Sequence, residues 1–220
     1  MFSRSILAQR CFGSAAAAGN RVGFVGLGNM GLPMANNLKK NGFQVKGFDI
    51  GDKQRQNATE CGIAVQDSLS NTVKDVDWIV TALPKTEHVE AALTGKDGIF
   101  EVANKGTYIL DTSTISPVAS ADFHQQALKH GMVFLDTPMS GGITGAHAGT
   151  LTFMVGGEAE QFEHAKACLK GMGANFFHCG KPGTGEIAKL VNNLILGITM
   201  VGVSEGFAIG EKLGADPKVL

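Results

Sequence analysis

The chain has 220 residues, of which 44% are hydrophobic and 18% are charged, and its formal net charge is −1. This composition excludes a disordered chain, which has low hydrophobicity and high charge, and it supplies enough apolar material for a sizeable core. A net charge close to zero gives no indication of binding to nucleic acid or to an anionic membrane, so we expect neither as a partner.

Residues 1–20, MFSRSILAQRCFGSAAAAGN, contain Arg, Ser and Ala and lack acidic residues. This composition is typical of a mitochondrial transit peptide, and a disordered leader without a targeting role is the alternative. A secretory signal fits less well because no long apolar core follows Arg4. We therefore expect residues 1–20 to be a transit peptide and the protein to act in the mitochondrial matrix.

Strands and helices alternate along the next part of the chain. Short apolar runs predict strands over 21–26, 43–49, 77–83, 107–111, 132–136, 151–155 and 175–179, and helices are predicted over 29–41, 52–61, 116–131 and 158–172. This alternation predicts an α/β fold in which a doubly wound parallel sheet of the Rossmann type occupies residues 21–182.

A single long helix is predicted over residues 184–213. Its apolar run, Leu194–Val203, is shorter than the ~20 residues of a membrane span, so we expect a buried helix. Gly214 and Pro217 then indicate a helix end and a new helix start. We expect residues 183–220 to be the start of a truncated, all-helical second domain.

A G-x-G-x-x-G motif lies between the first predicted strand and the first predicted helix, and it comprises Gly26, Leu27, Gly28, Asn29, Met30 and Gly31. In this context the glycines allow a tight turn, a close approach to a pyrophosphate and close packing of helix on strand. Asp49 ends the second strand, at about the ~20-residue distance of a ribose-binding acid. Its carboxylate would repel the 2′-phosphate of NADP, so we expect NAD. The alternatives are a ligand-free glycine turn and a solvated Asp.

Two further segments carry polar groups suited to chemistry. Lys189 and Asn193 share one face of the long helix among apolar neighbours, which would lower the pKa of the amine and let it exchange protons. Ser140, Gly141 and Gly142 follow a strand and could form an anion-binding nest. The alternatives are an ordinary surface lysine and a bare turn. The scattered cysteines and histidines lack metal spacing, so we expect no metal.

Together, four segments resemble the β-hydroxyacid dehydrogenase family: 26–38 (GLGNMGLPMANNL), 111–114 (DTST), 136–142 and 183–193. The resemblance, strongest to mitochondrial members, implies an NAD-dependent oxidation of 3-hydroxyisobutyrate to methylmalonate semialdehyde in valine degradation. It implies that Lys189 is catalytic and Asn193 assists it, and that Ser140, Gly141 and Gly142 hold the substrate carboxylate. It also implies that Leu83, Pro84 and Thr114 line the nicotinamide side of the cofactor.

The resemblance leaves alternatives open. One is an NADPH-dependent reductase of glyoxylate or succinic semialdehyde from the same family, and another is a non-catalytic nucleotide-binding protein. Family members continue into a helical domain that closes the active site. We therefore expect a homo-oligomer for a full-length chain, and we expect these 220 residues to bind NAD but to turn over a hydroxy acid poorly.

Overall fold

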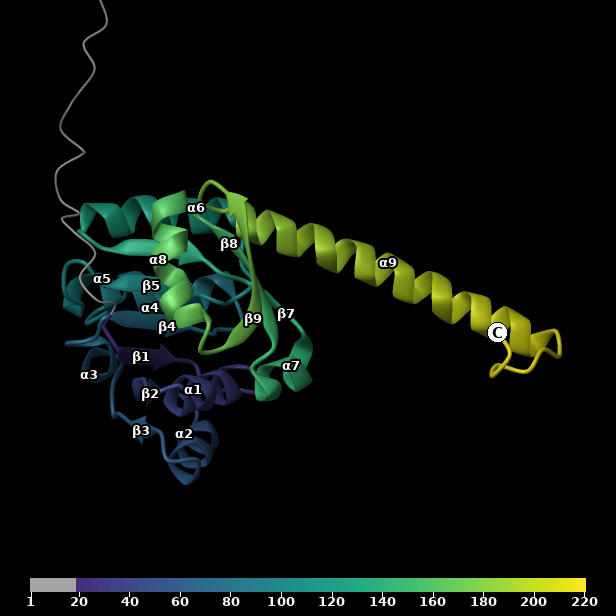
Figure 1. The fold of residues 1–220 in the computed structure, drawn as a ribbon, viewed down its shortest axis with the longest axis horizontal. Coiled ribbons are helices and arrows are strands. Elements are labelled where there is room, and N and C mark those ends of the chain that lie inside the picture. Colours follow the sequence, from purple (N-terminus) through teal and green to yellow (C-terminus); the bar gives the residue numbers. More distant parts are fainter. Residues whose placement is uncertain (1–18) are drawn as a thin grey trace, which may run out of the picture.

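The computed structural model describes residues 19–220, so nearly all of the predicted transit peptide lies outside the described residues. Within these residues nine strands form one sheet (Figure 1). They are β1 (Arg21–Val25), β2 (Gln44–Phe48), β3 (Ala64–Val65), β4 (Trp78–Thr81), β5 (Tyr108–Asp111), β6 (Val133–Asp136), β7 (Met139–Ser140), β8 (Leu151–Gly156) and β9 (Gly173–Gly180).

The helices between the strands cover both faces of the sheet. They are α1 (Gly31–Lys40), α2 (Asp52–Glu60), α3 (Leu69–Val73), α4 (Thr86–Thr94), α5 (Ile99–Val102), α6 (Pro117–Lys129), α7 (Gly142–Ala148) and α8 (Ala159–Leu169). The start of α6 matches its sequence signals, because the Ser116 hydroxyl accepts a hydrogen bond from the Ala119 amide and Pro117 occupies the first helical position.

The sheet is parallel over most of its width and mixed at one edge. Strands β3-β2-β1-β4-β5-β6 lie side by side and parallel, which is the strand order of a dinucleotide-binding Rossmann domain. Strand β8 is antiparallel to β6 and β7, and β9 pairs parallel with β8. The antiparallel pairing suits the short connection through α7, since only parallel neighbours need a long crossover. The predicted doubly wound α/β fold is confirmed, with this mixed edge added.

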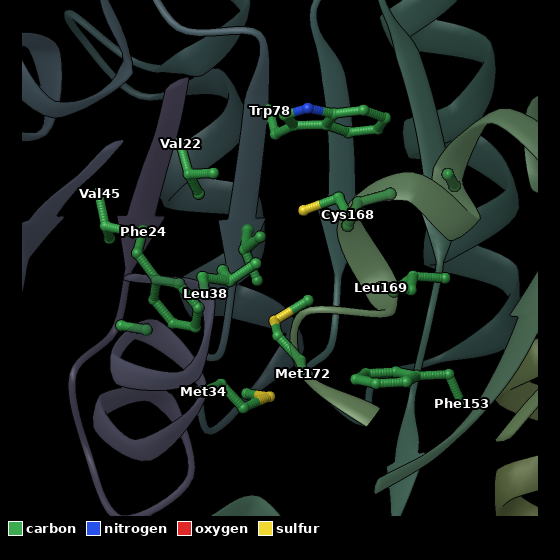
Figure 2. Packing of buried hydrophobic residues seen from close by; sticks show 14 of the residues in the cluster. Val22, Phe24, Met34, Leu38, Val45, Trp78, Phe153, Cys168, Leu169 and Met172 are labelled. Atoms are coloured by element: carbon green, nitrogen blue, oxygen red, sulfur yellow. The ribbon is translucent and has the colours of Figure 1, made fainter. Parts of the chain in front are cut away.

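Two apolar clusters, one on each face of the sheet, form the core. Successive residues of the buried strands point to opposite faces, so Val133 and Leu135 belong to one cluster and Phe134 to the other. Figure 2 shows the first cluster, where strand residues meet side chains of α1 and α8 such as Leu38 and Leu169. Helices α3 to α6 supply the second cluster.

Several short elements lie in segments without a periodic pattern of apolar residues. They are β3, β7, α3, α5 and α7, which have two to seven residues each, and the nine-residue helix α4. An element of one or two turns is too short for a period of 3.6 residues to stand out. Of these, β7 and α7 matter most for function, because they hold the Ser140–Gly142 segment.

The last helix, α9 (Thr184–Lys212), has 29 residues and projects away from the sheet (Figure 1). The expectation that Leu194–Val203 is buried is wrong, because Leu194 is 64% exposed and Ile198 is 66% exposed. The run is part of α9, which by length and composition alone is long and apolar enough to cross a membrane. The most apolar stretch of α9 has no buried share. An exposed apolar surface of this size is typical of a helix that packs against other protein or lipid.

We predict that the chain self-associates through α9. Replacing Leu194 and Ile198, one helical turn apart, by Asp should shift the chain toward monomer in sedimentation-velocity runs over a range of concentrations, because charge opposes burial of this surface. Leu128→Asp on α6, also an exposed apolar position, is the control and should leave the distribution unchanged. A wild-type chain that stays monomeric at every concentration would contradict the prediction.

Candidate functional site

A cavity of about 760 Å³ lies at the carboxyl ends of β1, β2, β4 and β5. Ligands bind at this place in open α/β sheets, where the strand order reverses between β1 and β4. Of the predicted cofactor residues, the cavity is lined by Gly26, Gly28, Asn29, Met30, Gly31, Asp49, Leu83, Pro84 and Thr114. Segments that are far apart in the sequence therefore meet around one space, whose volume is typical of a small-molecule site.

The three glycines of the turn after β1 have different surroundings. Gly26 has a φ of +95°, and a Cβ there would collide with the Ala82 carbonyl. A Cβ on Gly31 would collide with the Gly26 carbonyl, so this glycine permits close packing of α1 on the turn. Around Gly28 a Cβ would meet nothing within 4 Å, and this open space is where a ligand can approach the backbone. The following helix begins without a side-chain cap. The Leu32 amide donates to the Gly28 carbonyl and Pro33 has no amide hydrogen, so the Gly31 amide is the one in the first three helical residues that is left for an anion.

Asp49 connects this turn with the loop after β2. Its Oδ2 accepts a hydrogen bond from the Leu27 amide at 2.8 Å, and its Oδ1 accepts one from the Gly51 amide at 2.8 Å. Leu27 is itself buried, so its amide positions the carboxylate while its side chain packs in the core. Each carboxylate oxygen can still accept a second hydrogen bond, as binding to two ribose hydroxyls requires.

An arginine that the sequence analysis did not consider lies behind Asp49. Arg55 donates to the Asp49 carbonyl oxygen at 3.0 Å and forms an ion pair with the exposed Asp52. Its charge is thus partly offset by Asp52, and its side chain is absent from the cavity lining. Arg55 lies six residues after Asp49, and the first turn of α2 brings its side chain back to the Asp49 backbone.

The loops after β4 and β5 form the opposite side of the cavity and are held together by hydrogen bonds. The Leu83 amide donates to the Ser113 hydroxyl at 2.9 Å, and the Ser113 amide donates to Asp111 at 3.1 Å. Ser113 lines the cavity beside Thr114, and His88 of α4 also lines it. The sequence analysis missed both; Ser113 lies within the 111–114 segment that it did single out.

A buried carboxyl cluster lies beyond this loop and comprises Asp111, Asp136 and Glu186. All three are at most 1% exposed. Asp136 accepts hydrogen bonds from the amides of Gly183 at 2.8 Å and Glu186 at 3.1 Å, so it holds the first turn of α9. Burial raises the pKa of Asp111 to about 6 and that of Glu186 to about 9, and it also raises the pKa of Asp136. The sequence analysis did not identify this cluster.

The predicted catalytic and substrate residues lie outside the cavity lining. Lys189 is half-buried one turn into α9, where burial lowers the pKa of its amine, an effect that an ionised Glu186 would oppose. Asn193 is exposed one turn further on. Ser140 is half-buried opposite Thr152, and the adjacent Gly141 and Gly142 are exposed. Met139, directly before Ser140, does line the cavity, so this segment adjoins it.

The Ser140–Gly142 segment makes a tight turn beside the cavity. Gly141 has a φ of +128° and Gly142 a φ of +61°, so both have positive φ rather than the alternating right- and left-handed conformations of a regular nest. Neither glycine amide is consumed by β7, which ends at Ser140. The binding of a substrate carboxylate by this segment stays a prediction.

Comparison with known proteins matches two family models to the chain. A model described as the NAD binding domain of 6-phosphogluconate dehydrogenase matches residues 21–180. A model described as NAD-binding of NADP-dependent 3-hydroxyisobutyrate dehydrogenase matches residues 183–220. The first covers the whole sheet and the second covers α9.

Individual relatives agree with these models. The chain is 47% identical over 199 residues to a probable mitochondrial 3-hydroxyisobutyrate dehydrogenase of Dictyostelium discoideum, a match that covers 90% of this chain and 62% of that protein. It is 40% identical over 200 residues to an NAD-dependent L-serine dehydrogenase of Pseudomonas aeruginosa, covering 91% and 67% respectively. The structure of a Mycobacterium tuberculosis 3-hydroxyisobutyrate dehydrogenase with L-serine superimposes with a TM-score of 0.84 at 38% identity, covering 90% and 67%. The chain thus spans about three-fifths to two-thirds of the length of these relatives.

We predict that Asp49→Asn weakens NAD binding about 10- to 100-fold, because charge-assisted hydrogen bonds contribute about 1.5–3 kcal/mol. The preference for NAD over NADP should shrink at the same time, since the charge that repels a 2′-phosphate is removed. Calorimetric titration with each cofactor measures both effects. The exposed Asp122→Asn on α6 is the control and should bind like the wild type. Tighter binding of NADP than of NAD by the wild-type chain would contradict the prediction.

Proposed function

The chain belongs to the 3-hydroxyisobutyrate dehydrogenase family, and from this premise we propose that it performs an NAD-dependent oxidation of 3-hydroxyisobutyrate to methylmalonate semialdehyde in valine degradation. The observation that carries the proposal is the cavity at the reversal of strand order, where the glycine turn, Asp49 and the Leu83–Pro84 and Ser113–Thr114 segments converge. Residues 21–182 would form the NAD-binding domain, and residues 183–220 would begin a helical domain.

NAD fits the residues that are present. The open backbone at Gly28 and the uncapped start of α1 suit its pyrophosphate, and the Asp49 carboxylate suits its adenosine ribose. Leu83, Pro84 and Thr114 would contact the nicotinamide half, and Asn29 and Met30 would lie along the phosphates. When bound, NAD supplies the acceptor for a hydride from the substrate carbon.

The chain's own residues would bind the hydroxy acid and move its proton. The amides of Gly141 and Gly142 with the Ser140 hydroxyl would hold the carboxylate, which fixes the orientation of the hydroxyl-bearing carbon. Lys189 would accept the hydroxyl proton, because burial lowers its pKa and so makes more of the neutral amine available. Asn193, one turn further along α9, would donate a hydrogen bond to the same oxygen.

Other substrates share the features that this site recognises. L-serine also carries a carboxylate and a 3-hydroxyl group, and two of the matched proteins are named for it or solved with it. A reductase that uses NADPH is less favoured because Asp49 faces the cavity where a 2′-phosphate would lie. A non-catalytic nucleotide-binding protein would have no need of a half-buried lysine at position 189. A panel of short 3-hydroxy acids and L-serine with NAD and NADP separates these functions.

We further propose that α9 is covered by protein in the working molecule, in a homo-oligomer. The support is its exposed apolar surface and the match of its residues to a dehydrogenase family model. This assignment accounts for the hydropathy of α9 without a membrane. It also implies that the 220 residues alone bind NAD but turn over substrate slowly, since an open site weakens the electrostatics of the reaction.

Lys189→Ala should lower turnover by roughly 10²–10⁴, the usual contribution of a positioned acid–base group. Turnover is measured as NADH formation by the chain extended with the C-terminal region of the Dictyostelium relative. NAD affinity should persist, because the phosphate turn lies elsewhere. Lys189→Arg should not restore activity, because a guanidinium does not release its proton near neutral pH.

In the wild type, turnover should rise with pH through a pKa below the ordinary lysine value. Lys212→Ala, at the far end of α9, is the control. A Lys189→Ala protein within a few-fold of the wild type would refute the assignment.

The leader should be absent from the working protein. We propose a mitochondrial matrix location, which the mitochondrial relatives support, and a leader that ends before β1 begins at Arg21. N-terminal sequencing of protein isolated from mitochondria should therefore start between Gly13 and Arg21. Intact protein beginning at Met1 in the cytosol would contradict this location.

A further inference from the structure

Glu186 occupies an unusual position for an acidic side chain. It is 0% exposed, and within the 29 residues of α9 only Gly185 and Glu186 are buried. The residue therefore lies at the point where a long, otherwise solvent-facing helix enters the protein. A carboxyl group buried there needs a structural reason, because burying a charge without a partner is costly.

The contacts of Glu186 connect α9 with the loop after β5. Its Oε2 accepts a hydrogen bond from the Ile115 amide at 3.2 Å, and Ile115 directly follows the cavity-lining Thr114. Its own amide donates to Asp136. Glu186 thus joins the loop of β5 to the end of β6 through the first turn of the helix that carries Lys189.

The charges around Glu186 favour its neutral form. Two carboxyl groups face it, Asp111 from β5 and Asp136 from β6, and the Asp136 group itself faces Cys179 of β9. The one cation acting on it is Lys189, which is half-buried and three residues further along α9. Asp136 is the member best able to carry charge, since both its oxygens accept amide hydrogen bonds at the positive end of the helix.

Two carboxyl oxygens of the cluster have no hydrogen-bond partner in the described part of the chain, which also favours a neutral Glu186. Among the described residues, Glu186 Oε1 and Asp111 Oδ2 are buried and accept no hydrogen bond. A bare carboxylate oxygen is expensive in such a place, whereas a protonated oxygen is not charged. Burial and the Asp111 carboxyl together raise the pKa of Glu186 to about 9.

We infer that Glu186 is a positioning residue for Lys189, and that it ties the first turn of α9 to the cavity loop as a neutral carboxylic acid. Neutrality matters because an ionised Glu186 would stabilise the ammonium form of Lys189 and raise the pKa of the amine. A neutral Glu186 holds the first turn of α9 and leaves the pKa of the Lys189 amine low. The inference rests on the proposed function for the role of Lys189, but the anchoring and the charge state are independent of turnover.

Two substitutions separate the anchoring from the charge. Glu186→Gln keeps an oxygen that can accept from the Ile115 amide and cannot ionise, whereas Glu186→Ala removes the acceptor. Glu211→Gln, an exposed acid on the same helix, is the matched control. All are made in the 220-residue chain, and no measurement requires substrate. Should the alanine protein fail to fold, the glutamine protein alone still tests the charge state.

The first measurement is the unfolding constant in denaturant between about pH 5 and pH 8. The unfolded Glu186 ionises near its ordinary pKa while the folded one stays protonated, so stability is lost as pH rises. The unfolding constant of the wild type relative to Glu186→Gln should therefore increase about tenfold per pH unit. For Glu211→Gln the ratio should be flat. A flat ratio for Glu186→Gln as well would show an ionised Glu186 and overturn the inference.

The second measurement addresses positioning. The rate at which an amine reagent labels Lys189, followed by mass spectrometry between about pH 6 and pH 8, should be unchanged in Glu186→Gln, because Glu186 stays protonated below its pKa of about 9. Hydrogen exchange at the Ile115 amide should accelerate at least tenfold in Glu186→Ala and stay at the wild-type rate in Glu186→Gln. A Lys189 labelling rate that rises tenfold or more in Glu186→Gln over this pH range, or unchanged Ile115 exchange in Glu186→Ala, would overturn the inference. A failure of the proposed function would appear instead in the turnover of Lys189→Ala.

Discussion

The Asp136 carboxylate holds the two parts of the molecule together. It ends β6, and its two oxygens accept hydrogen bonds from the first-turn amides of α9. Glycines on both sides leave room for it, because a Cβ on Gly156 or on Gly185 would collide with its oxygens. This contact makes the long helix start at the same edge of the sheet as the cavity, so the position of Lys189 depends on it.

The strand ends along that edge present different parts of the site. The ends of β1 and β2 present the glycine turn and Asp49 to the half of the cavity suited to an adenosine and its phosphates. The ends of β4 and β5 present the segments that suit a nicotinamide, joined through Ser113. The end of β6 holds the helix with the proposed base. The acidic side chains also differ in their exposure to solvent. Asp49 lines the open cavity, whereas the carboxyl cluster of Asp111, Asp136 and Glu186 is buried.

Much of this arrangement is predictable from the sequence, because it depends on local patterns. Buried parallel strands are continuous apolar runs, and the glycine spacing with Asp49 has a known geometric meaning. The carboxyl cluster was not predictable, since its members are separated by 25 and 50 residues and meet only through the strand order. The apolar run of α9 by itself does not distinguish a buried helix from an exposed one, because it has the same sequence whether its partner is present or absent.

We propose that the cavity and the helix of Lys189 belong to one site, and a crystal structure of the chain with NAD tests this. We expect the pyrophosphate on the backbone around Gly28 and the adenosine ribose hydroxyls on Asp49. We also expect the nicotinamide between Pro84 and Thr114, with its reactive face toward Lys189. NAD bound in the reverse direction, or with its nicotinamide turned away from α9, would contradict it.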